Sequence, residues 1–131
     1  MPDEAQKSAP QATIERADDF RSLYANNVIA DGTAWDLRLT FGQFEKRADG
    51  SVVNTQRVSV TMPFGLAKLM MFWVELQIQV HERQMGQRVR IRPDVLPPMP
   101  PIPPESQNDE GYVRLHEMME KARQQLVSNS E

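Results

Sequence analysis

The sequence contains no cysteine, only two histidines and no long apolar run. Without cysteine there can be no disulfide, no thiolate nucleophile and no cysteine-ligated zinc or iron–sulfur site. No apolar stretch approaches the ~20 residues that a membrane-spanning helix needs, so a transmembrane protein is not expected. The acidic start Met1-Pro2-Asp3-Glu4 is followed by no apolar segment. This argues against a secretory signal peptide and predicts a cytoplasmic location.

Motifs typical of catalytic and cofactor sites are absent as well. The chain has no phosphate-binding loop, no dinucleotide fingerprint and no Gly-x-Ser-x-Gly elbow. His81 and His116 fall on separate predicted helices, and the pair His116 and Glu120 is by itself a weak basis for a metal site. We therefore predict no catalytic, cofactor-binding or metal-binding residues and a protein that is not an enzyme. An enzyme whose site forms across a subunit interface stays open as an alternative.

Charge is distributed unevenly over the 131 residues. Residues 1–20 carry a net charge of −3, residues 21–92 a net charge of +4 and residues 93–131 a net charge of −4. A +4 domain is well short of the strong basic footprint of a nucleic-acid-binding protein. The pattern favours acidic tails that keep a mildly basic core in solution.

The chain divides into four predicted segments. Residues 1–20 form a disordered acidic tail, 21–92 a β-β-β-α-β core domain, 93–107 a proline-rich linker, and 108–131 an amphipathic C-terminal helix and tail. In the core, strands are predicted over 24–30, 35–44 and 57–62, with a bulge or bend at Gly42 and a hairpin turn at 48–51. Each strand has one apolar face. The predicted fold class is α+β, a small antiparallel sheet of three to four strands covered by one long helix.

That helix is expected over residues 64–85, between Pro63, with Thr61 as a candidate cap, and Gly86. It carries two apolar rows, more than one sheet can cover, and an apolar surface of that size typically marks an interface. We predict a homodimer, with helices packed antiparallel about a two-fold axis. The first row, at coiled-coil spacing, consists of Leu66, Leu69, Trp73, Leu76 and Val80. The second row consists of Ala67, Met71, Val74, Ile78 and Met85. The predicted interface residues are Leu66, Leu69, Met70, Trp73, Leu76 and Val80.

Two alternative binding functions also fit the core. In residues 87–92 the apolar residues Val89 and Ile91 alternate with three arginines, which predicts a fourth strand with a basic face. That face would suit the phosphate spacing of extended nucleic acid, although charges at a strand edge also discourage aggregation. A methionine-rich apolar helix favours a peptide-binding or chaperone-like module instead. The arginines of the nucleic-acid alternative are Arg38, Arg57, Arg88, Arg90 and Arg92.

Beyond the core, residues 93–104 contain seven prolines, which predicts an extended polyproline spacer. After it, Asn108 or Asp109 is expected to cap a helix that runs to about Val127. The linker and helix together fit a tethered element that docks on a protein partner or folds back on its own domain. One face of this helix consists of Tyr112, Leu115, Met119, Ala122 and Leu126.

Several of these segments together resemble a known family. They are Tyr24-Ala-Asn26, the run Trp35-Asp-Leu-Arg-Leu-Thr-Phe-Gly42, and Met62-Pro63 with Ala67-Lys68 at the start of a long helix. This pattern, over roughly residues 22–92, resembles the prokaryotic family called domain of unknown function 3467. The chain departs from it at Leu37, where phenylalanine is common, and at His81-Glu82, where a Tyr-Glu pair usually stands. The resemblance implies a small sheet-plus-helix domain and carries no catalytic residues over.

Overall fold

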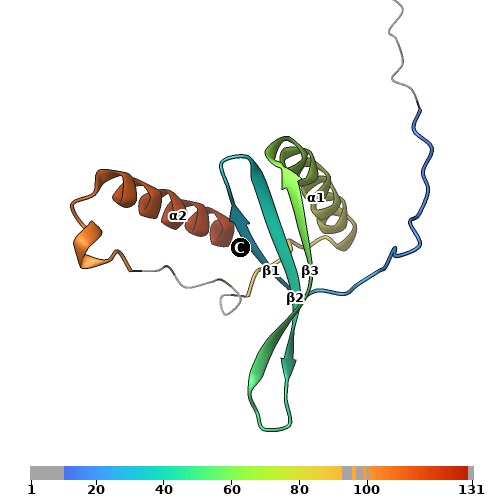
Figure 1. The fold of residues 1–131 in the computed structure, drawn as a ribbon, viewed down its shortest axis with the longest axis horizontal. Helices are drawn as coiled ribbons and strands as arrows, with labels where there is room; N and C mark the ends of the chain where they lie inside the picture. The colour runs from blue at the N-terminus through green and yellow to red at the C-terminus, as the bar shows by residue number, and fades with distance from the viewer. Residues whose placement is uncertain (1–10, 93–95, 97–98, 100, 130–131) are drawn as a thin grey trace, which may run out of the picture. The chain divides into compact units, whose positions relative to one another are not determined.

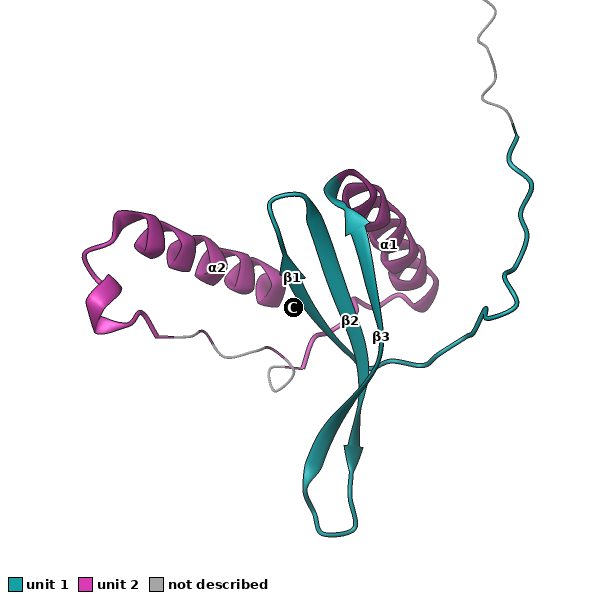
Figure 2. Cartoon of the chain, in the orientation of Figure 1, with its two compact units in different colours: residues 1–64 teal, residues 65–131 magenta. Residues whose placement is uncertain are grey.

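The computed structural model describes residues 11–92, 96, 99 and 101–129, and it has the predicted α+β class (Figure 1). Along the described residues, three strands come first, followed by a long helix, a 3-10 turn and a second helix. The chain divides into two units, residues 1–64 and 65–131, so the strands belong to the first unit and the helices to the second (Figure 2). The elements are β1 (Asn27–Gly32), β2 (Asp36–Lys46), β3 (Val52–Pro63), α1 (Phe64–Met85), η2 (Pro104–Ser106) and α2 (Glu110–Ser128).

The sheet is antiparallel, with β2 between β1 and β3. β1 pairs only with residues 37–42 of β2, whereas β3 pairs with β2 along its whole length. Past the end of β1, the other two strands therefore continue as a twisted two-stranded arm (Figure 1). A two-stranded ribbon twists more than a wider sheet because it has no third strand to restrain it.

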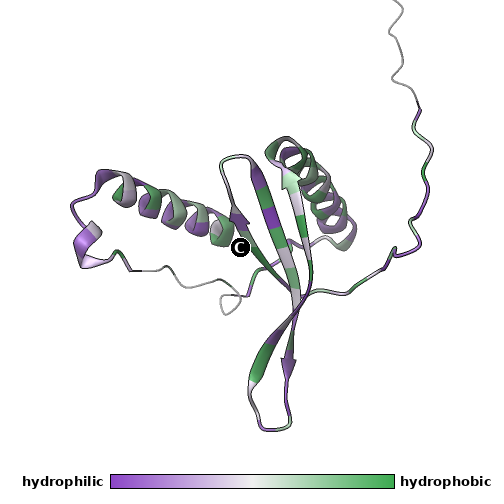
Figure 3. Cartoon of the chain, viewed as in Figure 1, coloured by the Kyte–Doolittle hydropathy of each residue, from purple (hydrophilic) through white to green (hydrophobic). Residues whose placement is uncertain are grey.

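Apolar and polar side chains alternate along the strands, as predicted (Figure 3). Directly paired residues of antiparallel strands share a face, so one face of the sheet is apolar. Leu39 at the centre of this face and Met62 near its end are buried, whereas Val28, Val58 and Val60 are substantially exposed. The members of the face are Val28, Ala30, Leu37, Leu39, Phe41, Val58, Val60 and Met62.

The predicted irregularity at Gly42 is a β-bulge. Phe41 pairs with Val58 and Gly42 with Gln56, so Arg57 is the extra residue of β3. Gly42 is buried because the side chain of Asn54 lies against it. The Asn54 amide crosses β2 and donates from Nδ2 to Oδ1 of Asn27 in β1, at 2.8 Å. A side chain at position 42 would collide with that amide and approach the Thr55 carbonyl oxygen to 3.0 Å.

The hairpin turn between β2 and β3 also forms where it was predicted. The Gly50 N–H donates to the Arg47 carbonyl at 3.0 Å, and the Arg47 N–H donates to the Ser51 carbonyl at 2.8 Å. Gly50 has φ 85°, the left-handed conformation that three-residue hairpin loops require at this position. Asp49 Oδ1 accepts from both the backbone N–H and the hydroxyl of Ser51, at 2.9 and 2.6 Å. These hydrogen bonds, the hydroxyl bond foremost, hold the pKa of the Asp49 carboxyl below its usual range.

α1 begins and ends at the predicted residues. Pro63, expected to mark the start of the helix, is the last residue of β3. Because β3 is the outer strand of the three, the missing N–H of proline costs no bond there. The chain therefore passes from strand to helix with no connecting loop. Gly86, with φ 66°, follows Met85 in the left-handed conformation that ends many helices.

The predicted fourth strand over 87–92 is wrong. These residues belong to no helix or strand, so the β-β-β-α-β order stops at α1. A strand needs backbone partners, but the Val89 N–H donates instead to the Glu82 side chain, Oε2, at 2.8 Å. The left-handed turn at Gly86 sends the chain back toward the end of α1, where this carboxylate is the nearby acceptor.

The C-terminal helix is confirmed, with Asp109 as its N-cap. Asp109 Oδ1 accepts from the N–H groups of Gly111 and Tyr112, at 3.0 and 3.2 Å. In the proline-rich segment, Pro103 has φ −57° and ψ 143°, the polyproline conformation expected there. Pro93, Pro97, Pro98 and Pro100 lie outside the described residues, as do residues 1–10 of the predicted acidic tail.

Candidate interaction surface

The predicted interface residues lie along one side of a continuous helix. We call Leu66, Leu69, Trp73, Leu76 and Val80 the seam row. Spacings of three and four residues place them on one stripe of α1, and each is between 37% and 54% exposed. Met70, the sixth predicted residue, borders the stripe and is half-buried. Figure 3 shows hydrophobic residues along the length of α1.

In the second apolar row of α1, one residue is buried and the other four are exposed. Ala67, close to the start of the helix, is 7% exposed, but Met71, Val74, Ile78 and Met85 are all exposed. Apolar side chains exposed on two sides of one helix are unusual for a surface helix, which has a single apolar stripe. Exposed apolar patches of this kind occur at protein-binding, membrane-binding and ligand-binding surfaces.

Two aromatic rings widen the middle of the seam row. Phe72 and Trp73 meet edge to face, with ring centroids 5.3 Å apart and planes at 68°. Both side chains are more than half exposed. Tryptophan and other large aromatic residues contribute much of the binding energy at protein interfaces, because they bury a large apolar area with few rotatable bonds.

Beside Trp73 lies an apolar hollow of about 380 Å³. After Gly86 the chain turns back toward α1, and Val89 forms one side of the hollow. The hydrogen bond from the Val89 N–H to the Glu82 carboxylate fixes this position. Sequence reasoning missed the hollow because it placed Val89 in a strand. The left-handed turn expected at Gly86 was the only signal that pointed to it. The hollow is lined by Trp73, Val74, Gln77, Ile78, His81 and Val89.

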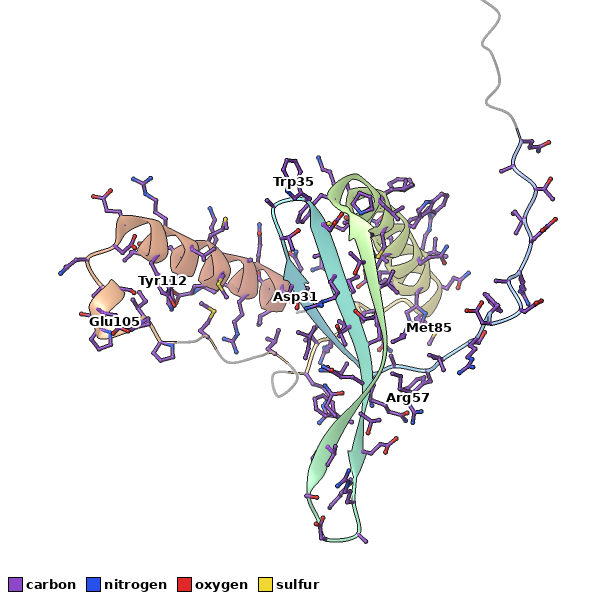
Figure 4. The ribbon with its side chains drawn as sticks, viewed as in Figure 1. Asp31, Trp35, Arg57, Met85, Glu105 and Tyr112 are labelled. Carbon is purple, nitrogen blue, oxygen red and sulfur yellow. The ribbon has the colours of Figure 1, made fainter. Side chains whose placement is uncertain are left out.

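The five arginines of the nucleic-acid alternative do not form one basic strand face. Arg38 makes a bidentate ion pair with Asp31 across β1 and β2, with Nε–Oδ1 and Nη2–Oδ2 distances of 2.9 and 2.6 Å (Figure 4). This hydrogen bonding lowers the pKa of the Asp31 carboxyl and raises that of the Arg38 guanidinium. The positive charge of Arg38 is therefore matched locally by a carboxylate.

Arg57, the extra residue of β3 at the bulge, also has a carboxylate partner. It lies 3.3 Å from a carboxylate oxygen of Glu45. The remaining arginines, at 88, 90 and 92, do not stand on a strand, which removes the regular phosphate-like spacing on which the alternative depended.

A second, polar hollow lies on the sheet around the Asp31–Arg38 pair. It has a volume of about 340 Å³ and is bordered by the turn between β1 and β2. Thr33 Oγ1 orders this turn by accepting from the N–H groups of Trp35 and Asp36, at 3.2 and 3.1 Å. The turn carries Trp35 at its tip, 82% exposed (Figure 4). Of the three charged residues of the hollow, Asp31 and Arg38 are paired with each other and Asp36 belongs to the turn that Thr33 orders, so this arrangement is typical of a stabilised turn.

The histidines are not gathered with other metal-binding side chains. His81 lines the apolar hollow, and His116 lies on α2. Within the described ranges, no three histidine, aspartate or glutamate side chains come together as a group that could hold a metal ion. Within the same ranges, neither helix combines the length and apolarity that crossing a bilayer requires.

Comparisons of this chain with protein-family models, with curated proteins and with solved structures give no match. The resemblance to the domain of unknown function 3467 family therefore stays a prediction.

Proposed function

We propose that this protein is a non-enzymatic, homo-oligomeric interaction or scaffold module that dimerises through the seam row of α1. The observation that carries the proposal is the exposure of all five seam-row side chains on one stripe of a 22-residue helix. A second copy presents the same stripe, so one interface serves both subunits. A cytoplasmic location, consistent with a chain that has no cysteine, belongs to the same proposal.

The energy available from this row fits a reversible dimer. Complete burial of a large apolar side chain contributes about 1.5–3 kcal/mol, and about half of each seam-row side chain remains to be buried. Five such side chains on each of two copies contribute roughly 8–15 kcal/mol. Association costs about 4–15 kcal/mol of lost freedom. The net is modest, so we expect the dimer to dissociate on dilution.

The test compares two matched tryptophan substitutions, since the chain has only Trp35 and Trp73. We expect the wild type to show a dimer mass by light scattering and Trp73→Glu to show a monomer mass, because burying a carboxylate in an apolar interface is costly. Trp35→Glu makes the same chemical change on the β1–β2 turn and is expected to stay dimeric. A wild type that is monomeric at all concentrations would refute the proposal.

The two alternatives have distinct outcomes in the same preparations. A peptide-binding module would use the apolar hollow on α1, so a monomeric wild type that binds apolar peptides would favour it. A partner reached through the linker and α2 is compatible with dimerisation through α1.

Nucleic-acid binding would appear as a rise in the fluorescence anisotropy of labelled DNA or RNA on addition of the protein, with an affinity that falls as the salt concentration rises. No feature of the described arginines favours that outcome.

A further inference from the structure

β1 is the outer strand on one side of the sheet, and no strand of the described part of the chain pairs with its free edge (Figure 1). Its hydrogen bonds to β2 fix which residues face outward. The Thr33 N–H donates to the Asp36 carbonyl at 2.9 Å, and bonded and non-bonded pairs alternate along antiparallel strands. Ile29 and Asp31 therefore direct their backbone groups to β2. The residues whose N–H and C=O groups point away from the sheet are Val28, Ala30 and Gly32.

The two edges of the sheet differ in what protects them. β3, the other outer strand, ends in Pro63 and carries the bulge at Arg57, and both features discourage a further strand. β1 contains no proline, and its register with β2 has no shift. Val28 and Ile29 are about half exposed, one on each face of the strand. An exposed strand with unpaired backbone groups and apolar side chains is a template for another strand.

The sequence of β1 matches itself when a second copy runs antiparallel about a two-fold axis at Ile29. In this register Val28 of one copy stands opposite Ala30 of the other, and each such pair exchanges both of its N–H···O bonds. The two Ile29 side chains meet at the axis in a non-bonded pair, where facing side chains are closest. Moving the axis to Ala30 would place Ile29 opposite the charge of Asp31, which is unfavourable.

The polar side chains beside the axis are complementary as well. Asn27 of one copy stands opposite Asp31 of the other. Asn27 Oδ1 accepts from Asn54, which leaves its Nδ2 group to donate to this carboxylate. On the opposite face, Val28 and Ala30 continue the apolar face from one copy to the other. This register therefore joins like face to like face.

We propose that β1 pairs with β1 of a second copy, antiparallel and centred on Ile29, so that the two three-stranded sheets become one. This contact goes beyond the proposed dimerisation through the seam row and does not depend on it. A short row of hydrogen bonds and small side chains offers less apolar area than the seam row. We therefore expect the pairing to be the weaker contact and to join seam-row dimers only at high protein concentration, as a scaffold requires.

Cysteine cross-linking traps this pairing, because the chain has no native cysteine. Ile29→Cys is made in the full chain together with Trp73→Glu, which removes the seam-row contact. On oxidation at high protein concentration we expect covalent dimers, since the Cα atoms of a non-bonded pair lie about 4.5 Å apart, within the range of a disulfide. Ser59→Cys, on the outer strand β3 in the same background, is the matched control. We expect it to give at most about a tenth of that yield.

Two further variants test the register. Val28→Cys and Ala30→Cys are oxidised separately and as a mixture, in the same background. We expect covalent dimers only in the mixture, because each residue lies two positions away from its own counterpart, more than about 7 Å and too far for a disulfide. Covalent dimers of Val28→Cys alone would overturn the register and with it the proposal.

A proline tests the hydrogen bonds. The N–H of residue 30 makes no bond to β2, so Ala30→Pro removes only the outward donor and leaves the sheet intact, which circular dichroism checks. Added to Ile29→Cys, it is expected to slow cross-linking about tenfold, because half of the hydrogen bonds between the copies are lost. Ser59→Pro removes an outward N–H from β3 and is expected to leave the rate unchanged.

The outcomes separate this inference from the proposed function. If Ile29→Cys gives no more covalent dimer than Ser59→Cys while a thiol reagent modifies it fully, the edge is open for a different protein strand and pairing between copies is refuted. An unchanged cross-linking rate in Ala30→Pro refutes it as well. Neither result bears on the seam row, which the comparison of Trp73→Glu with Trp35→Glu by light scattering tests separately.

Discussion

Asn54 and Gly42 form a close contact at the bulge of the sheet. Asn54 reaches over Gly42 to bond Asn27, so one side chain ties together three strands. Its Oδ1 atom is buried without a hydrogen-bond partner. Leaving an acceptor buried and unpaired costs free energy, which the bond between the outer strands must offset. The glycine is required because any side chain there would displace Asn54.

We predict that Gly42→Ala lowers the free energy of unfolding by about 1–3 kcal/mol, since the added methyl group overpacks the bulge. Urea unfolding followed by circular dichroism measures the loss. The double variant Gly42→Ala with Asn54→Ala is expected to recover part of it, because the amide that collides is gone. A single variant as stable as the wild type would contradict this account.

The Asp31–Arg38 pair makes stability depend on pH. The pKa of the Asp31 carboxyl is lowered in the folded protein, mainly by its hydrogen bond from Arg38. The contribution of the Asp31–Arg38 pair to the free energy of unfolding is therefore complete above the pKa of Asp31 in the unfolded chain, which is about 4. It is lost as the pH falls through the lower pKa of Asp31 in the folded protein. We expect Arg38→Gln to raise the titration midpoint of Asp31 observed by NMR.

The control for that titration lies in the same unit. The pKa of Asp49 is lowered by Ser51 and not by Arg38, so its midpoint should stay where it is in the Arg38→Gln variant. If the Asp31 midpoint also stays in place, the ion pair is not formed in solution.

At the scale of elements, the stability of α1 depends on the glycines at its two ends. Gly65, in the first turn, has open space around the position of a side chain, and Gly86 adopts a left-handed conformation after the last turn. The same substitution should therefore have opposite effects at the two ends. Alanine favours helical residues and disfavours the left-handed region.

We predict that Gly65→Ala raises the free energy of unfolding by up to about 1 kcal/mol, because alanine has the higher helix propensity. Gly86→Ala is expected to lower it by about 1–2 kcal/mol through strain at positive φ. Urea midpoints followed by the helical signal at 222 nm report both changes. Changes of the same sign in the two variants would be inconsistent with these helix ends.

At the scale of the whole molecule, the proposed dimerisation through α1 would make stability depend on protein concentration. If the folded chain binds a second folded copy, stability rises with protein concentration by mass action. We expect the thermal midpoint to rise by roughly 5 °C for each tenfold increase in concentration. Calorimetry over a hundredfold range measures this. In Trp73→Glu the thermal midpoint should not depend on protein concentration. A wild-type midpoint that stays constant over the same range would contradict the proposed dimer.

Features that depend on a few neighbouring residues followed from the sequence alone. The limits of α1, the hairpin turn at Gly50 and the cap of α2 are short-range effects of turn and capping chemistry, and all three were predicted, the cap as either Asn108 or Asp109. The alternation of the strands and the spacing of the seam row are equally local, because backbone geometry sets the period of each element.

Contacts between distant parts of the chain were decided only in three dimensions. Sequence alone does not show that Arg38 meets Asp31 or that Asn54 covers Gly42, because such contacts depend on the register of paired strands. The error over 87–92 has the same origin. An alternating pattern is compatible with a strand, but a strand also needs a backbone partner, and here the Val89 N–H bonds the Glu82 side chain instead.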